Sequence, residues 1–400
     1  MNGNGNGNRD VEVVVVGGGY GGVTAANRLA RRDGVSVTLV NPRPDFVERI
    51  RLHQLVTGSD DAVVGFDEVL GGNVRLVVDT ATRIDAAERR VSLAGGGTLP
   101  YDYLVYAVGS GASGPGVPGA AEFTHAVSDL EGAQRLRSVL AATPASDPVT
   151  VVGSGPTGLE TAAELAELGR KVTLVCGDVL GPSLHARVRR PVARRLAELG
   201  VTVLEGPRAR VTEVTRDGVR LDDGRELPST VTIWTAGFRV PDLAARSGLR
   251  TDAEGRLVTD ATLTSVDDVR IVAAGDAAVM TDTPFRMSCQ AAVQLGPAAA
   301  DTILRRIAGK KAAAVRMFFA GQCLSLGRDE GVTQFSYPND KVNALSISGR
   351  PGAGVKEIAC RFTLDKLVSG ARKAGSRASR ASRGRGGPSR SAPDQWAGRR

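Results

Sequence analysis

Two glycine-rich turns, far apart in the chain, have the spacing that binds a nucleotide pyrophosphate. They are Gly17-x-Gly19-x-x-Gly22 and Gly153-x-Gly155-x-x-Gly158. In such a turn the first glycine allows a tight bend, the second lets the backbone approach the phosphates, and the third lets a helix pack closely on a strand. The helix that follows offers free N–H groups and a positive dipole to the phosphates. The chain therefore carries two candidate dinucleotide sites.

Each turn lies between a predicted strand and a predicted helix, which is the context that this chemistry needs. Residues 11–16 form a β-branched run typical of a buried parallel strand, and a helix from about 23 to 31 and a strand over 35–40 are expected after the turn. The second turn repeats this order with a strand over 149–152, a helix to about 168 and a strand over 171–175. We therefore expect an α/β fold with two Rossmann-like domains.

An acidic residue is expected at the end of the second strand of each unit, where it accepts hydrogen bonds from ribose. In the first unit this position holds Asn41, whose amide oxygen can still accept a hydrogen bond. In the second unit it holds Cys176, and Asp178 is the nearest acid. No cluster of arginines follows to hold a 2′-phosphate. The choice between NADH and NADPH is therefore left open, with a slight preference for NADH.

The net charge of +8 comes entirely from the C-terminal end of the chain. Residues 369–400 contain nine of the 51 basic residues and one of the 43 acidic residues, so the rest of the chain is neutral, with 42 of each. This balance does not favour a nucleic-acid partner. We expect residues 1–10 to be a flexible lead and 369–400 to be a disordered basic tail. No apolar run reaches the roughly 18–20 residues that span a bilayer, which predicts a cytoplasmic protein, soluble or peripheral to a membrane.

Three further motifs strengthen the interpretation of the two turns. Strand 269–274 leads into Gly275-Asp276, and the segments Tyr101–Gly109 and Trp234–Gly237 resemble paired crossover strands at a domain junction. In this order, the five motifs resemble those of the FAD/NAD(P)-binding pyridine nucleotide-disulfide oxidoreductase superfamily, over roughly residues 11–310. The resemblance implies that FAD binds at the first turn and NAD(P)H at the second.

The resemblance also implies which residues touch each cofactor. For FAD these are Gly17, Gly19, Tyr20, Gly21, Gly22, Asn41, Arg43, Gly109, Gly275 and Asp276. For NAD(P)H they are Gly153, Gly155, Pro156, Thr157, Gly158, Glu160, Asp178 and Gly237. No metal site is expected. Glu160 would touch the nicotinamide, and the alternative is that it is a first-turn carboxylate favoured by the helix dipole.

The same resemblance predicts how the chain is divided. The FAD domain would comprise residues 11–118 and 239–310, with the NAD(P)H domain, 119–238, inserted into it. A small α+β C-terminal domain would follow over 311–368. The Gly- and Pro-rich segment 111–119 would serve as a hinge. A homodimer is left open.

Four cysteines, Cys176, Cys289, Cys323 and Cys360, are widely spaced and form no CxxC motif. The cysteine pairs of the disulfide reductases are therefore missing, which predicts direct transfer of electrons from flavin to an acceptor. Three stretches resemble the type II NADH:quinone dehydrogenases and the apoptosis-inducing-factor-like oxidoreductases. They are Phe46 with 52–58, Gln290-Ala-Ala-Val-Gln294, and 321–327. In those enzymes the two glutamines line the flavin and quinone site, so Glu160, Gln290 and Gln294 are the candidate catalytic residues; alternatively, the glutamines are a solvated pair.

The predicted reaction passes hydride from NAD(P)H to flavin N5 and then two electrons to a quinone-like acceptor. The acceptor is alternatively a soluble aromatic or polyketide metabolite. A third hypothesis is a redox-regulated flavoprotein that binds a partner through its basic tail, and the tail could also contact anionic lipid electrostatically. The three histidines, His53, His125 and His185, are expected to be structural.

Overall fold

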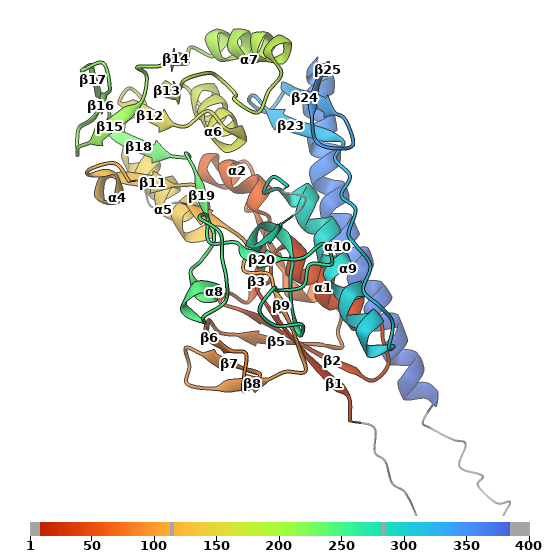
Figure 1. Ribbon diagram of the computed structural model, residues 1–400. Coiled ribbons are helices and arrows are strands. Elements are labelled where there is room, and N and C mark those ends of the chain that lie inside the picture. The colour runs from red at the N-terminus through yellow and green to blue at the C-terminus, as the bar shows by residue number, and fades with distance from the viewer. Residues whose placement is uncertain (1–8, 113–115, 282–284, 385–400) are drawn as a thin grey trace, which may run out of the picture.

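The computed structural model describes residues 9–112, 116–281 and 285–384, with side chains described as far as residue 375. Two parallel sheets, each with helices against it, lie at opposite ends of the molecule, and one long helix runs along the side of both (Figure 1). The predicted α/β class with two Rossmann-like units is confirmed.

The first unit is a five-stranded parallel sheet in the order β21-β9-β1-β2-β5. Its strands are β1 (Val11–Val16), β2 (Val35–Asn41), β5 (Val74–Val78), β9 (Tyr103–Tyr106) and β21 (Ile271–Ala273). Helices α1 (Tyr20–Leu29) and α9 (Cys289–Ile307) pack together on it. An antiparallel sheet, β6 (Ala81–Asp85), β7 (Arg90–Leu93) and β8 (Thr98–Pro100), accompanies it. The chain leaves this sheet after β9 and returns at β21, so the second unit is inserted into the first.

The second unit repeats the arrangement with a parallel sheet in the order β11-β18-β12-β13-β14. The strands are β11 (Thr124–Ala126), β12 (Pro148–Val152), β13 (Lys171–Gly177), β14 (Thr202–Glu205) and β18 (Val231–Trp234). The helices are α5 (Leu130–Ala142), α6 (Pro156–Glu167) and α7 (Ala186–Glu198). Its antiparallel sheet is β15 (Val211–Val214), β16 (Gly218–Leu221) and β17 (Glu226–Pro228).

Two short strands lie side by side where the chain crosses between the units. They are β10 (Gly111–Ala112) and β19 (Phe238–Arg239), which pair antiparallel. The remaining short elements are β3 (Asp45–Val47), η1 (Arg49–Arg51), α2 (Leu52–Thr57), β4 (Val63–Gly65), α3 (Phe66–Val69), α4 (Ala120–Phe123), α8 (Leu243–Arg246), β20 (Leu257–Thr259), η2 (Gly275–Ala277) and β22 (Ala278–Met280). In sequence, helix α2 lies between β2 and β5 of the first unit, yet it packs against α5 and α6 of the second unit and joins their hydrophobic core.

The first helix begins earlier than the sequence pattern predicts. It starts at Tyr20, directly after the N-cap residue Gly19, rather than near Val23. The glycine-rich motif predicts that Gly21 and Gly22 belong to the turn that precedes the helix. In the structure both lie in the first turn of α1, where small residues let the helix approach the neighbouring chain segments. The second helix likewise starts at Pro156, after Gly155.

The C-terminal region consists of an antiparallel sheet and a long helix. The sheet contains β23 (Gly321–Ser325), β24 (Gly331–Ser336) and β25 (Val342–Gly349), and α10 (Arg350–Gly384) follows directly. Figure 1 shows α10 passing from this sheet down the side of the first unit, where it packs against α1 and α3. Among the helices in the described residues, none is long and apolar enough to span a bilayer.

The expectation of a disordered tail from residue 369 is wrong as far as residue 384, because α10 continues to Gly384. Leu367, Ala371 and Ala374 are all buried, and Leu367 and Ala374 belong to the core of the first unit. Their spacing, three and four residues apart, is that of one helix face. The mean composition of the segment hid this stripe. Residues 385–400, and 1–8 of the predicted lead, lie outside the described residues.

Candidate active site

The first glycine turn has the geometry that its spacing predicts. Gly17 has a φ of +104°, and a Cβ there would overlap the carbonyl oxygen of Ala107. A Cβ on Gly22 would overlap the carbonyl oxygen of Gly17. A Cβ on Gly19, in contrast, would meet nothing within 4 Å. The outer two glycines are thus needed by the fold itself, and the middle one faces open space in front of the helix N-terminus.

The three glycines of the second turn have conformations and surroundings like those of the first. Gly153 has a φ of +106°, a Cβ on Gly158 would overlap the carbonyl oxygen of Gly153, and Gly155 again faces open space. Pro156 and Thr157 open helix α6, where proline is favoured because its missing N–H would have no partner in the helix. Gly237, with a φ of +81°, follows β18 at the crossover.

Asp276 lies next to the first turn, although it is far away in the sequence. It sits in η2, and a Cβ on Gly21 would lie 3.3 Å from the backbone nitrogen of Gly275. The hydroxyl of Ser110, just after Gly109, donates to Asp276 at 2.7 Å. The guanidinium of Arg49 lies 3.9 Å from the same carboxylate. The predicted Gly109 and Gly275-Asp276 segments are therefore brought together with the turn.

Asn41 and Arg43 are placed at the end of β2, but both side chains are engaged within the protein. The Asn41 Oδ1 accepts from the backbone N–H of Gly18 at 3.0 Å, and its Nδ2 donates to the carbonyl of Arg43 at 2.8 Å. The Arg43 guanidinium pairs with Glu131 of α5, in the second unit. In this structure Asn41 fixes the shape of the turn and Arg43 links the two units.

Two buried polar atoms near the first turn have no hydrogen-bond partner among the described residues. They are the hydroxyl of Tyr20 and the Oε1 of Gln290. Burial raises the pKa of Tyr20 well above its usual value, and the neighbouring Cys289 adds to this. Unpaired buried groups are costly unless a ligand satisfies them. Together with the open cradle at Gly19, they fit a bound flavin dinucleotide.

The two glutamines of α9 have different environments. Gln294 is committed to the backbone of Phe318: its Nε2 donates to the carbonyl at 2.8 Å, and its Oε1 accepts from the N–H at 3.1 Å. It therefore clamps the segment after α9 onto that helix. Of the two glutamines, only Gln290 has a buried side-chain oxygen, its Oε1, without a hydrogen-bond partner among the described residues.

The ribose end of the second unit contains an arginine that sequence reasoning missed. Strands β2 and β13 end at Asn41 and Gly177, and the offset that relates Gly17 to Gly153 also relates these two residues. Gly177, rather than Cys176, is thus the counterpart of Asn41. Asp178 follows, and it forms a bidentate pair with Arg210, at 2.6 and 3.3 Å. Arg210 comes from the chain after β14, which is why no arginine was visible near Asp178 in the sequence.

Glu160 is buried, but its partners come from the C-terminal region. Its carboxylate lies 2.9 Å from the ammonium of Lys356 on α10 and accepts from the backbone N–H of Ser325 at 3.1 Å. Burial would raise the pKa of Glu160, but Lys356 and His53 outweigh it and hold the pKa below its usual value. Burial likewise lowers the pKa of Lys356, and the attraction of Glu160 reverses this, so the pKa lies above its usual value. Both groups are therefore charged at neutral pH.

His53 on α2 lies on the other side of Glu160, and it is not an isolated histidine. Its Nδ1 is 3.7 Å from Glu160, and its Nε2 is 3.4 Å from Glu164, one turn further along α6. The hydroxyl of Ser325 lies 3.2 Å from the same Nε2. The imidazole is 3% exposed. Neither Lys356 nor Glu164 was found from the sequence, because the contacts join segments more than 100 residues apart.

Helix α2, which carries His53, is tied to α10 by a second ion cluster. Arg51 is 7% exposed and pairs with Glu357 at 3.0 Å and with Glu48 at 3.4 Å. The hydrogen bond from Arg51, against a smaller effect of burial, lowers the pKa of Glu357 to about 2. This cluster joins the start of α2 to α10, the two helices whose residues His53 and Lys356 each contact Glu160.

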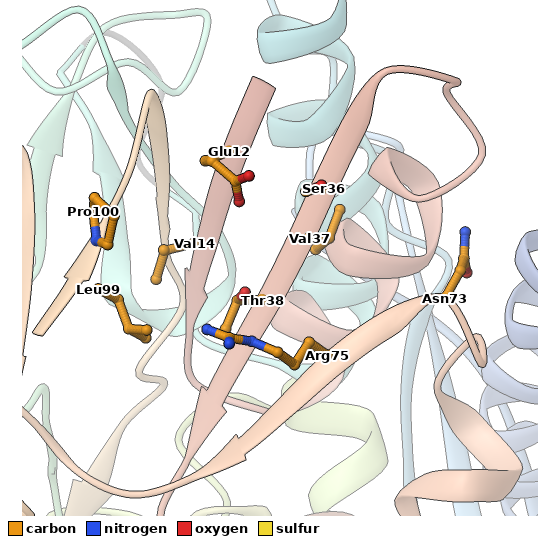
Figure 2. A pocket seen from close by; sticks show the side chains of 9 residues that line it. All are labelled: Glu12, Val14, Ser36, Val37, Thr38, Asn73, Arg75, Leu99 and Pro100. Atoms are coloured by element: carbon orange, nitrogen blue, oxygen red, sulfur yellow. The ribbon is translucent and has the colours of Figure 1, made fainter. Parts of the chain in front are cut away.

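A cavity of about 350 Å³ lies away from both glycine turns. It lies over the first sheet, between strands β1, β2 and β5 and the β8 residues Leu99 and Pro100 (Figure 2). The polar residues that line it are Glu12, Ser36, Thr38, Asn73 and Arg75. It is open to solvent and contains none of the predicted site residues, so it is not part of the candidate active site.

Comparison with known proteins agrees with this geometry. Residues 11–299 match the family of pyridine nucleotide-disulphide oxidoreductases. An NADH dehydrogenase-like protein of Mycobacterium tuberculosis is 32% identical, over 78% of this chain and 85% of its own length. A type II NADH:quinone oxidoreductase of the same organism is 30% identical, over 84% of this chain and 80% of its own. The solved sulfide:quinone oxidoreductase of Aquifex aeolicus shares the fold, with a TM-score of 0.77 and 22% identity over 90% of this chain and 92% of that one.

The family match covers both glycine turns, the crossover strands and the Gly275-Asp276 segment. The fold joins these segments as the resemblance implied, with the second nucleotide unit inserted into the first. The chain thus belongs to the pyridine nucleotide-disulphide oxidoreductases, and it is an FAD-dependent oxidoreductase of NAD(P)H.

Proposed function

We propose that the enzyme passes two electrons from NADH or NADPH, through bound FAD, to a quinone, without a redox-active cysteine pair. The observation that carries the proposal is the buried contact between Glu160, just after the second glycine turn, and Lys356 of the C-terminal helix. Through this contact the second nucleotide unit and the C-terminal region meet at one buried ion pair. The quinone is the acceptor that the name of the type II relative gives for that protein.

Bound FAD would accept hydride at its N5 and store the electron pair between the two half-reactions. The residues of this chain would align the reactants and exclude water. The N-terminus of α6, at Gly155, would hold the pyrophosphate of the nucleotide, and Glu160 would meet its nicotinamide end. Gln290, whose Oε1 is buried and unpaired, would face the flavin or the quinone.

The state of the cysteines supports direct transfer to the acceptor. In the described part of the chain all four are free thiols. Burial raises the pKa of Cys176 and of Cys360 to about 11, and it also raises the pKa of Cys289. Disulfide exchange needs a thiolate, which these environments disfavour.

An anaerobic stopped-flow experiment tests the proposal. We expect the purified yellow holoenzyme to lose its flavin absorbance when NADH or NADPH is added, and to regain it when a short-chain ubiquinone follows. Alkylating the thiols with iodoacetamide should leave the turnover unchanged. Failure of either nucleotide to reduce the flavin, or failure of the quinone to reoxidise it, would contradict the proposal.

We also propose peripheral contact with a membrane, through exposed apolar side chains of the C-terminal region. Those more than half exposed are Phe318, Tyr337, Leu345, Ile358 and Phe362. Ile358 and Phe362 are four residues apart on α10 and therefore share a face. Turnover should then be faster with a long-tailed quinone in liposomes than with a hydrophilic one, and the double variant Ile358→Ser/Phe362→Ser should abolish the difference. Equal rates with both quinones would favour a soluble aromatic or polyketide acceptor.

The hypothesis of a partner bound through the basic tail loses support. Half of that segment, 369–384, is helical, and Ala371 and Ala374 are packed on the first unit. It is therefore not a free arm. Binding through 385–400 would have to be tested by deleting those residues.

A further inference from the structure

The cavity over the first sheet is lined by polar side chains that the fold itself does not require. The strands of a parallel sheet are usually apolar on both faces, because other elements cover both. In β1, β2 and β5 this pattern is broken by Glu12, Thr38 and Arg75, and all three line the cavity. Val13 and Leu39 point to the opposite face and belong to the hydrophobic core. The charged residues of these strands are thus confined to the face that meets the cavity.

The strand register places these side chains around one space. Val14 pairs with Thr38, and Thr38 pairs with Arg75, so the three residues form a row across the sheet. Glu12 is one pair further along β1, opposite Ser36. From the spacing of strands and residues in a sheet, the Cα atoms of Glu12 and Arg75 are roughly 12 Å apart. Their side chains therefore reach into the same space, and Figure 2 shows the side chain of Arg75 extending past Thr38, below Glu12 in the view.

These three polar groups have no partner in the described part of the chain. The side chain of Thr38 is 7% exposed, yet its hydroxyl forms no hydrogen bond with any described residue. Among the same residues, the carboxylate of Glu12 and the guanidinium of Arg75 form no ion pair. A nearly buried hydroxyl without a partner is costly unless water or a ligand satisfies it. A ligand in the cavity could pair with all three groups.

The two ends of the cavity carry opposite charges. At the β1 end, the serine hydroxyl opposite Glu12 donates to Asp10 at 3.2 Å, so two carboxylates lie there. The backbone N–H of Glu12 donates to Asp102 at 2.9 Å, and Arg9 neutralises Asp102 through an ion pair at 3.0 Å. The β5 end carries Arg75, the basic residue among those that line the cavity. A simple anion would therefore be repelled by one end, and a simple cation by the other.

One wall of the cavity is apolar. It consists of Val14, which is 2% exposed, and of Leu99 and Pro100 from β8, which lie beside it in Figure 2. The volume of about 350 Å³ is enough for a molecule of some ten heavy atoms, since small-molecule pockets measure roughly 300–1,000 Å³. A ligand that fits this site therefore has two opposite charges and a short apolar body.

We propose that this cavity binds a small zwitterion with an apolar body, the chemical class of the aliphatic α-amino acids. The ammonium of the ligand lies against Glu12, and its carboxylate accepts paired hydrogen bonds from Arg75. The hydroxyl of Thr38 donates to the same carboxylate, and the aliphatic part lies against the apolar wall. Both charges of the ligand are then balanced, and the hydroxyl gains the partner that it lacks.

The site is separate from the electron-transfer centre, but it shares two strands with the first glycine turn. Strand β1 leads directly into Gly17, and β2 ends at Asn41. A ligand that bridges β1, β2 and β5 binds the folded sheet and not the unfolded chain, so it stabilises the first unit. Binding should therefore raise the unfolding temperature of the holoenzyme, whichever acceptor the flavin reduces.

Calorimetric titration of the holoenzyme with L-leucine and two analogues tests the proposal. Isoamylamine keeps the ammonium and the aliphatic chain of leucine, and 4-methylpentanoate keeps the carboxylate and the chain. We expect leucine to bind and to raise the unfolding temperature. Each analogue lacks one charge-assisted contact, so it should bind about tenfold more weakly, or less tightly still. Absence of leucine binding, or an analogue that binds as tightly as leucine, would overturn the proposal.

Three variants of the holoenzyme locate the binding. Glu12→Gln should remove the advantage of leucine over 4-methylpentanoate, and Arg75→Met its advantage over isoamylamine. Thr38→Val removes only the hydroxyl and should weaken leucine binding roughly fivefold. Glu68→Gln and Arg83→Met change exposed charges of the same unit outside the cavity, so they serve as controls and should bind leucine like the wild type. All five should keep their flavin, and leucine binding that is unchanged in the three cavity variants would equally overturn the site.

Discussion

The two nucleotide units begin with the same turn and diverge one helical turn later. The offset that relates Gly17 to Gly153 places Thr24 opposite Glu160. The Thr24 hydroxyl bonds back to the carbonyl of Tyr20, in its own helix, and a Cβ on Gly296 of α9 would overlap it. Glu160 instead reaches out of its helix to Lys356.

This difference shows what each helix packs against. Helix α1 is covered by the small side chains of α9, so its outer face is closed, apolar and in close contact. Helix α6 is covered by polar groups from α2, β23 and α10, which form a buried charged junction. Under the proposed function, the closed contact in the first unit would suit FAD that stays bound, and the charged junction in the second would suit a nucleotide that binds and leaves.

The strongest test of the comparison is the same substitution in both units. Gly22→Ala and Gly158→Ala each place a Cβ on the carbonyl oxygen of the first glycine of the turn. Over-packing of this kind costs roughly 1–3 kcal/mol and opens the turn. We expect Gly22→Ala to lose its flavin absorbance and to unfold at a lower temperature. Gly158→Ala should keep the flavin and lose the reduction by NADH.

Gly206→Ala is the matched control for added volume, because a Cβ there meets nothing within 4 Å. Its φ of +116° still makes it strained, so it should lower stability a little while leaving flavin content and NADH reduction intact. If Gly158→Ala lost flavin as readily as Gly22→Ala, the two units would not be separable.

The next test compares Thr24 with Glu160. Thr24→Val removes one hydrogen bond to a carbonyl that stays bonded in the helix, so the free energy of unfolding should fall by only about 0.5–1.5 kcal/mol. Glu160→Gln leaves Lys356 as a buried charge without its partner, and should cost about 3–5 kcal/mol. Urea unfolding at pH 7 measures both.

The pH dependence of this cost has a definite sign. The pKa of Glu160 is lower in the folded state than its usual 4.5, so its carboxylate contributes fully above pH 4.5. The contribution is lost as the pH falls through the lowered pKa. The gap between wild type and Glu160→Gln should therefore shrink in acid. A double variant with Lys356→Met should recover part of the loss at pH 7, and no recovery would mean that Lys356 is not the partner that matters.

The contrast also marks how far the sequence could lead. Local spacing predicts both glycine turns and the parallel strands around them, and the resemblance predicts the inserted second unit. The turns can be found because the strand, the glycines and the helix that make up each of them follow one another in the sequence. Lys356, Glu164 and Arg210 could not be found in this way. Each of these residues interacts with a partner on another element, far away in the sequence. A single sequence does not show which distant residues form such pairs. The helix over 369–384 was missed for a different reason: average composition outweighed the stripe at Leu367, Ala371 and Ala374.

The smallest expected effect concerns the ribose end, where the two units also differ. Asn41 is an uncharged amide, and it is hydrogen-bonded to Gly18 and Arg43 within the first unit, so its position offers no charge to a ribose or a 2′-phosphate. The exposed pair of Asp178 and Arg210 in the second unit offers both a carboxylate for a ribose hydroxyl and a guanidinium for a 2′-phosphate. Which nucleotide binds better should depend on which of the two charges is removed.

Asp178→Asn should shift the preference of the holoenzyme toward NADPH, and Arg210→Leu should shift it toward NADH. Because both side chains of the pair are exposed and screened by solvent, we expect each shift to be small, roughly fivefold. Calorimetric titration with 2′,5′-ADP and 5′-ADP measures it without any turnover. Glu226→Gln, in an exposed pair on β17, is the control and should change neither affinity. If Arg210→Leu bound 2′,5′-ADP as tightly as the wild type, the 2′-phosphate would have to be read elsewhere. The charged side chains at the ribose end of the second unit would then have a structural role only, as Asn41 and Arg43 have in the first unit.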